Sequence, residues 1–157
     1  MAETRHVTPA QLEAALGRLS RSLTETGMRD VLQAMGFILH SRSMTSFERE
    51  TAPQHADGMA GEGRPWAPLK PSTIAGRRSG PGEGGPQILV DTGALRQRVV
   101  IATRPGEVEV GTAIFYGLYH QTGTRRNLPS RPFIGYNDED MDKGRTLIME
   151  TIQEALR

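Results

Sequence analysis

The sequence contains no cysteine, and this absence excludes several kinds of chemistry at once. Disulfide bonds, thiolate nucleophiles and cysteine-ligated zinc or iron–sulfur sites all require that side chain. Long hydrophobic runs are missing as well, because no stretch approaches the ~20 apolar residues that span a bilayer, and we expect no membrane partner. The first residues carry acidic side chains and lack an apolar core, so we expect no signal peptide.

Aromatic residues and net charge are also scarce: aromatics make up 5% of the 157 residues, and the formal net charge is +1. We therefore expect a small core, and the total charge indicates no partner. The charge is nevertheless uneven, since residues 64–131 hold 10 basic and 4 acidic side chains while both flanks are acidic. Most basic residues are arginine, whose planar guanidinium suits contacts with carboxylates or phosphates.

The spacing of apolar residues predicts helices at both ends of the chain. Residues 8–49 are predicted to be helical, beginning with a capping box at Thr8 and broken by a turn or kink near Thr26-Gly27. Gly36 would allow another element to approach the second helix closely. Residues 137–156 are predicted to form a C-terminal helix with acidic residues in its first turn, where the helix dipole favours them.

Residues 50–87 are predicted to form an extended arm. The stretch 49–87 holds 8 of the 18 glycines and 6 of the 10 prolines, which disfavour helices and central strands. Loops of this length are commonly functional or ordered by a partner, so we expect the arm to gain its shape beside another chain. Trp66, the single tryptophan, lies in this arm. Two alternatives stay open for it: a core residue, or an anchor against a neighbouring chain.

Residues 88–135 are predicted to form antiparallel strands and a loop. The alternation of glutamate and valine over 107–112 is typical of a strand with one buried face, and it follows the run 96–103 across a turn at Pro105-Gly106. The apolar run Ile88–Val90 is interpreted as a further short strand.

A short helix over 114–121, a loop over 122–130 and an extended segment over 131–135 complete this region. The fold predicted for residues 1–157 is a single α+β domain. In it, N-terminal helices and a C-terminal helix pack on a small antiparallel sheet with long Gly/Pro-rich loops.

The motifs that would indicate catalysis, a cofactor or a metal site lack the structural context or the spacing that such sites require. Gly80–Gly85 matches the spacing of a dinucleotide fingerprint, but a loop precedes it and no helix follows. The four histidines lack metal-ligand spacing. A hydrolase remains a weak alternative, combining Ser130 or Thr92 with His120 and Asp91, and no local signature supports it. We expect neither an enzyme nor a cofactor.

Several short strings occur in order along the chain: Trp66-x-Pro68-Leu69, Thr73, Ile88-Leu89-Val90-Asp91-Thr92-Gly93-x-Leu95, Val110-Gly111-Thr112, Tyr116, His120-Gln121-x-Gly123 and Arg131-Pro132-Phe133-Ile134-Gly135. Together they resemble the phage virion-morphogenesis family, the tail-completion proteins of Mu-like and P2-like phages. The block from His120-Gln121-x-Gly123 to Arg131-Pro132-Phe133 is also similar to neck and tail-joining proteins of long-tailed phages.

This resemblance implies a structural protein that acts late in tail assembly at the head-proximal end of the tail, as a ring of six. It implies the host cytoplasm during assembly and the tail or neck of the mature virion as locations. The implied partners are further copies, the tail tube or sheath protein, and head–tail connector proteins. The residues we expect at such interfaces are Trp66, Leu69, Arg77, Arg78, Arg125, Arg126, Arg131 and Phe133.

The alternative is a nucleic-acid-binding accessory protein that contacts the genome end at the neck. Basic loop residues would then meet phosphates. Aromatic residues for base stacking are scarce in these loops, so any DNA contact would be unspecific.

Overall fold

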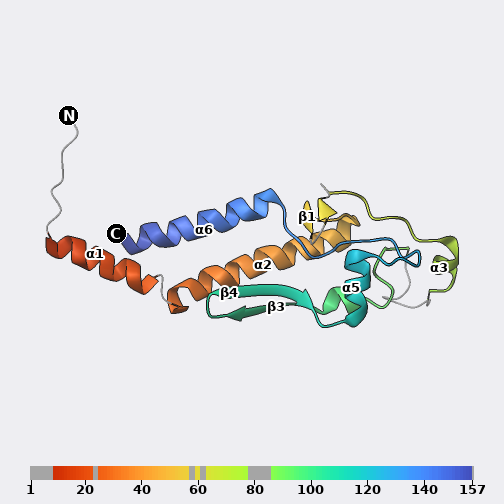
Figure 1. Ribbon diagram of the computed structural model, residues 1–157, viewed down its shortest axis with the longest axis horizontal. Coiled ribbons are helices and arrows are strands. Elements are labelled where there is room, and N and C mark those ends of the chain that lie inside the picture. Colours follow the sequence, from red (N-terminus) through yellow and green to blue (C-terminus); the bar gives the residue numbers. More distant parts are fainter. Residues whose placement is uncertain (1–8, 23–24, 57–58, 61–62, 78–85, 157) are drawn as a thin grey trace, which may run out of the picture.

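The molecule is elongated and is organised along one long helix (Figure 1). The computed structural model describes residues 9–22, 25–56, 59–60, 63–77 and 86–156. Helix α2 (Glu25–Arg49) runs through the middle, with α6 (Asp138–Leu156) on one side and the hairpin of β3 (Val99–Arg104) and β4 (Glu107–Thr112) on the other. Helix α1 (Pro9–Ser22) packs against α6 and α2. The predicted α+β class is confirmed.

The break between the first two helices lies earlier than predicted. Helix α1 ends at Ser22 and α2 begins at Glu25, so the predicted turn at Thr26-Gly27 falls inside α2. Glycine costs about 1 kcal/mol relative to alanine in a helix, and a long helix that packs against α6, β3 and β4 can accommodate this cost. Helix α6 occupies the place predicted for the C-terminal helix.

The predicted hairpin is confirmed, and it packs closely on α2. Strands β3 and β4 pair antiparallel along their whole length around a turn at Pro105-Gly106, where Gly106 has φ +73°. A Cβ at Gly36 of α2 would lie 2.6 Å from Ile101 Cγ2 and 2.8 Å from Val108 Cγ2. The hairpin therefore reaches the helix because Gly36 has no side chain, as the sequence predicts.

The segment Ile88–Val90 forms a turn, so the predicted strand is wrong. Leu89 has φ +61°, and the N–H of Ile88 donates to Glu50 Oε1 at 2.6 Å instead of to a strand. Both apolar side chains are buried, which explains why the run resembles a strand in sequence. A helical turn, α4 (Ala94–Gln97), also replaces the predicted start of the next strand, so β3 begins at Val99 and not at residue 96.

The described part of the 50–87 arm makes hydrogen bonds within itself and to Arg131 and Pro132 of its own chain. That a neighbouring chain gives the arm its shape stays a prediction. The N–H of Trp66 donates to Glu50 O at 2.7 Å, and the N–H of Ala52 donates to Arg64 O at 2.9 Å. Residues 78–85 lie outside the described residues. Three short elements belong to the arm: β1 (His55–Ala56), β2 (Met59–Ala60) and α3 (Pro71–Ala75).

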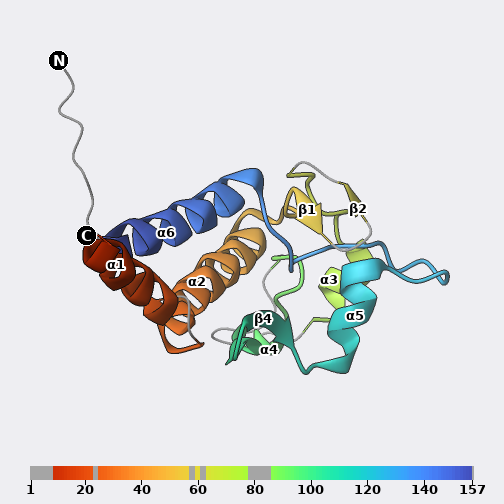
Figure 2. The same cartoon turned by 60° about the vertical axis from the view of Figure 1, so that its left-hand side comes forward.

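The core lies at the C-terminal end of α2. Phe47 packs edge-on to Trp66 with ring centroids 5.8 Å apart, and it contacts Phe133 at 5.3 Å. In Figure 2, α1, α2 and α6 gather at one end of the molecule, and α3 and α5 (Phe115–Thr122) lie at the other. The buried cluster consists of Phe47, Trp66, Ile88, Leu89, Leu95, Val99 and Phe133.

Candidate functional site

Three predicted interface residues are buried within their own chain. Trp66 is 5% exposed, Arg131 5% and Phe133 0%. The core alternative for Trp66 therefore holds, and its use as an anchor against a neighbouring chain does not. Phe133 is corrected in the same way, since packing against Phe47 removes its ring from the surface.

The polar atoms of two of these residues connect distant segments. The Trp66 Nε1–H donates to Pro132 O at 2.9 Å. In the opposite direction, the Arg131 guanidinium donates to Ala67 O at 2.9 Å and to Pro68 O at 3.1 Å. Because buried backbone carbonyls need donors, these bonds fix the two segments against each other.

Gln121, on α5, completes this arrangement. Its Oε1 accepts the backbone N–H groups of Phe133 at 3.1 Å and Ile134 at 3.2 Å, and its Nε2 donates to Ile134 O at 2.7 Å. Gln121 is 7% exposed. We call Trp66, Gln121 and Arg131 with these bonds the clamp. Sequence reasoning gave Gln121 no role, although it lies in the His-Gln-x-Gly string.

The other predicted arginines differ in their surroundings. Arg77 Nη1 donates to Gln87 O at 2.6 Å, which turns it toward its own chain. Arg125 and Arg126 are exposed in the loop after α5. Arg78 lies outside the described residues. Of these positions, Arg125 and Arg126 thus present their charge most openly to a partner.

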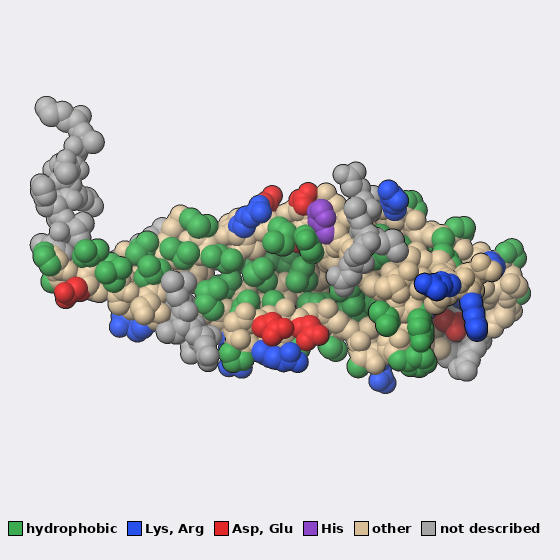
Figure 3. All heavy atoms as spheres, viewed as in Figure 1, with side chains coloured by type: hydrophobic (Ala, Val, Ile, Leu, Met, Phe, Trp, Pro, Cys, Tyr) green, Lys and Arg blue, Asp and Glu red, His purple; other side chains and the backbone are tan. Residues whose placement is uncertain are grey.

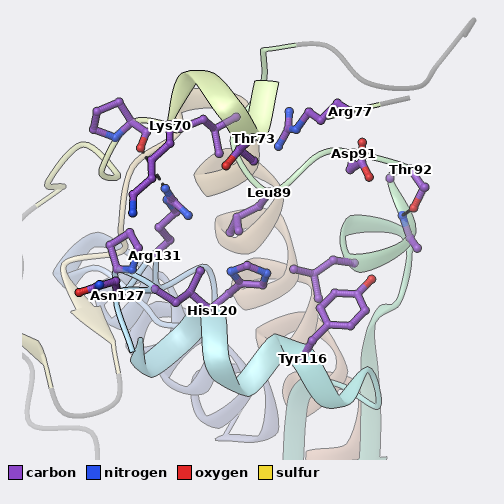
Figure 4. A pocket seen from close by; sticks show the side chains of 17 residues that line it. Lys70, Thr73, Arg77, Leu89, Asp91, Thr92, Tyr116, His120, Asn127 and Arg131 are labelled. Carbon is purple, nitrogen blue, oxygen red and sulfur yellow. Dashed lines mark hydrogen bonds between the residues drawn. The ribbon is translucent and has the colours of Figure 1, made fainter. Parts of the chain in front are cut away.

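A pocket of about 600 Å³ lies beside the clamp (Figure 4). Its walls come from the segment before α3, from α3 and α4, from α5 and from the loop that leads to Arg131. Its apolar lining includes Leu69, which is half-buried against the core, together with Leu89, Leu95 and Tyr116. The predicted interface residue Leu69 therefore lies in a concave site and not on an open surface.

The pocket carries more positive than negative charge. Lys70, Arg77 and Arg131 line it, and Asp91 is the acidic side chain in its described lining. In Figure 4, Lys70 and Arg131 lie on one side and Asp91 and Thr92 on the other. Burial, together with the charge of Arg77, lowers the pKa of Arg131. The positive potential is therefore concentrated at the side of the pocket next to the clamp.

His120 lines this pocket from α5, together with Asp91 and Thr92 of the hydrolase alternative. Its Nδ1 is buried and has no hydrogen-bond partner in the described part of the chain. Burial, and secondarily the charge of Arg131, lower the pKa of His120, so the ring is neutral at neutral pH. The Ser130 hydroxyl donates to Gln121 O at 2.8 Å. The serine and histidine of the hydrolase alternative are thus not hydrogen-bonded to each other.

The described residues hold neither a metal-binding group of side chains nor a membrane-spanning helix. Within the ranges that the structure describes, no group of three or more histidines and carboxylates is placed to hold a metal ion. None of the helices in those ranges is both long and apolar enough to cross a bilayer.

A known protein family matches nearly the whole chain. The family model of the phage virion morphogenesis family matches residues 7–157. The chain belongs to the phage virion morphogenesis family. The resemblance inferred from the short strings is thereby confirmed. No curated protein and no solved structure matches the chain.

Six of the seven strings that resemble this virion-morphogenesis family contribute to two adjoining places in the fold, and the exception is Val110-Gly111-Thr112 in β4. Some of their residues make the clamp, and others, far apart in sequence, line the pocket. Tertiary structure brings the second group together on loops and short helices, so spacing along the chain carried no sign of the pocket. The pocket-lining residues from these strings include Leu69, Thr73, Asp91, Thr92, Tyr116 and His120.

Proposed function

We propose that this protein completes the phage tail at its head-proximal end, where it forms a ring, of six copies in the simplest case, in head–tail joining. Membership of the virion morphogenesis family supports a structural role in phage assembly. The proposed role is not catalytic. It is carried out in the host cytoplasm during assembly and in the tail or neck of the virion thereafter. The proposed partners are the tail tube or sheath protein and the connector proteins.

The observation that carries the ring is the presence of two exposed apolar surfaces away from the core. The first lies on α1, where Leu12 and Leu16 are 53% and 55% exposed, and Met149 of the neighbouring α6 is exposed as well. The second is a groove between α2 and β3 lined by Phe37 and Val100, which are 58% and 55% exposed. Hydrophobic side chains also gather over the middle of the molecule in Figure 3. Exposed apolar surface of this kind marks interaction sites.

Two different surfaces are what a ring requires. A head-to-tail contact joins one surface of each copy to another surface of the next, and it closes into a ring when the rotation allows. We propose that the α1–α6 surface of one copy meets the α2–β3 groove of the next.

Light scattering on purified protein over a range of concentrations tests this arrangement. We expect the wild type to form a discrete ring and two variants to remain monomeric: Leu12→Gln with Leu16→Gln, and Phe37→Gln. Each variant keeps one intact surface, so their mixture should give heterodimers that do not grow further. Ile74→Gln, on α3 and outside both surfaces, is the matched control and should leave the ring intact.

A wild-type chain that is monomeric at every concentration contradicts the ring. In phage particles, loss of the protein should leave tails of uncontrolled length that do not join heads, because an unterminated tube continues to polymerise. Tails of normal length attached to heads, seen by electron microscopy, would contradict tail completion.

A nucleic-acid-binding accessory role is the second candidate function, and the exposed pair Arg125 and Arg126 supports it. Titration with a short DNA duplex between ~50 and ~200 mM salt separates the two functions. Strong binding that falls steeply with salt, and that is lost in Arg125→Ser with Arg126→Ser, would favour this alternative over the ring.

A further inference from the structure

The pocket beside the clamp holds a buried cation, Arg131, that has no anion beside it among the described residues. The Arg131 guanidinium uses two of its five N–H donors, for Ala67 O and Pro68 O. No carboxylate lies within ion-pair distance of it in the described part of the chain. A buried charge without a counter-ion is costly, so an incoming carboxylate would be stabilised here.

The surroundings of Arg131 increase this demand for an anion. Lys70 and Arg77 line the same pocket, and Asp91 lies across it from Lys70 and Arg131 (Figure 4). Nearby His120 is neutral and has a buried Nδ1 without a partner among the described residues. Among the described lining residues, one carboxylate stands against three cations, so the described lining keeps a net positive charge.

The rest of the lining decides which anion fits. Leu69, Leu89, Leu95 and Tyr116 form an apolar surface next to the cations. A nucleic-acid backbone would bring successive phosphates against this surface and against Asp91, which disfavours it. A peptide with a carboxylate beside an apolar side chain matches both parts.

We propose that this pocket receives a peptide segment of another particle protein, in which an Asp or Glu carboxylate lies next to an apolar side chain. The carboxylate pairs with Lys70 and Arg131, and the apolar side chain packs on Leu69 and Leu89. This inference rests on the proposed function for the source of the segment. It needs no ring, because the pocket lies within one chain.

Fluorescence anisotropy with synthetic peptides tests the site. The probe is a labelled, end-capped peptide, Ser-Leu-Glu-Leu-Glu-Ser, and the matched probes replace Glu by Gln or Leu by Ser. We expect the parent probe to bind and each replacement to weaken binding by about tenfold. Glu to Gln loses charge-assisted hydrogen bonds, which are about twice as strong as neutral ones, and Leu to Ser loses buried apolar area. Inorganic phosphate and a DNA duplex serve as competitors.

Three variants locate the binding. Lys70→Met should weaken the probe about fivefold, and Asp91→Asn should strengthen it by removing a like charge. Arg125→Met removes the same charge as Lys70→Met but lies outside the pocket lining, so it should have little effect. Circular dichroism of all three variants shows whether the fold is kept. If Lys70→Met unfolds, the binding strength of Asp91→Asn still tests the site.

Several outcomes would overturn the proposal. Equal losses in Lys70→Met and Arg125→Met would show unspecific charge attraction. Displacement by duplex DNA but not by unlabelled peptide would show a phosphate site. Loss of the ring in Lys70→Met would show that a second copy fills the pocket. An intact ring without peptide binding would reject this inference alone, whereas peptide binding by a monomer would reject only the ring.

Discussion

The two halves of the molecule are packed in different ways. Around the C-terminal end of α2, seven buried side chains form one cluster, and the clamp ties it to the segments on either side. In the other half, Val31 is the one core side chain among the described residues that lies outside this cluster. The core half buries its own apolar surface, and the helical half leaves much of its apolar surface exposed.

Polar contacts partly compensate for the thin packing of the helical half. Arg42 of α2 donates to both carboxylate oxygens of Asp140 on α6, at 2.7 and 2.9 Å. At the far end of α6, Arg18 Nε donates to Ala155 O at 3.2 Å. The helices are thus held near their ends while their flanks stay open. The comparison indicates that the core half specifies the fold and the helical half offers surface for assembly.

The largest expected effect is in the core half. Trp66→Ala removes a ring that packs on Phe47 and a hydrogen bond to Pro132 O. We expect a loss of about 3–5 kcal/mol in the free energy of unfolding, measured by urea denaturation. A stable monomer that merely fails to assemble would instead make Trp66 an interface residue and blur the distinction between the halves.

Asp140→Asn should have the next largest effect, about 3 kcal/mol, because it leaves Arg42 without its main anion. Burial alone would raise the pKa of Asp140, but hydrogen bonds from Arg42 and from the Asn137 backbone hold it below its ordinary value of 3.8. The pair therefore stabilises the fold fully above that value and is lost as pH falls through the lowered pKa. Urea curves of wild type and variant should converge at low pH, and a constant difference would contradict this.

Gly36→Ala tests the contact between the hairpin and α2. The added Cβ must displace Ile101 and Val108, which costs about 1–3 kcal/mol, and alanine's better helix propensity offsets about 1 of it. We expect a net loss of about 1 kcal/mol by thermal denaturation. Gly17→Ala, in α1 with open space around the glycine, is the control and should stabilise slightly. Equal stabilisation by both changes would mean that the hairpin is not held against the helix.

The smallest expected effect on stability comes from Leu12→Gln with Leu16→Gln. Both side chains are exposed, so the free energy of unfolding of the monomer should change by less than about 0.5 kcal/mol per site. A substantial loss measured under conditions that keep the chain monomeric would show that the helical half already uses these residues to fold.

Much of the fold could be predicted from local pattern. The hairpin alternates visibly between glutamate and valine, the C-terminal helix has a periodic apolar face, and Gly36 signals a close approach. The strand expected at Ile88–Val90 was wrong because burial on all sides produces an apolar run whether the backbone is extended or turned. The arm could not be predicted because hydrogen bonds join Trp66, Ala67 and Pro68 to Arg131 and Pro132, which lie far along the chain.

The sequence by itself determined helices α1, α2, α5 and α6, the hairpin, the family and the basic character of the middle region, because each depends on neighbouring residues or on their order. Only the tertiary structure decided that Trp66 and Phe133 are core, that Arg131 is buried with no described carboxylate beside it, and that residues from six of the seven strings line one pocket. Burial and charge compensation depend on which segments meet in space, and the order of residues along the chain does not record those meetings.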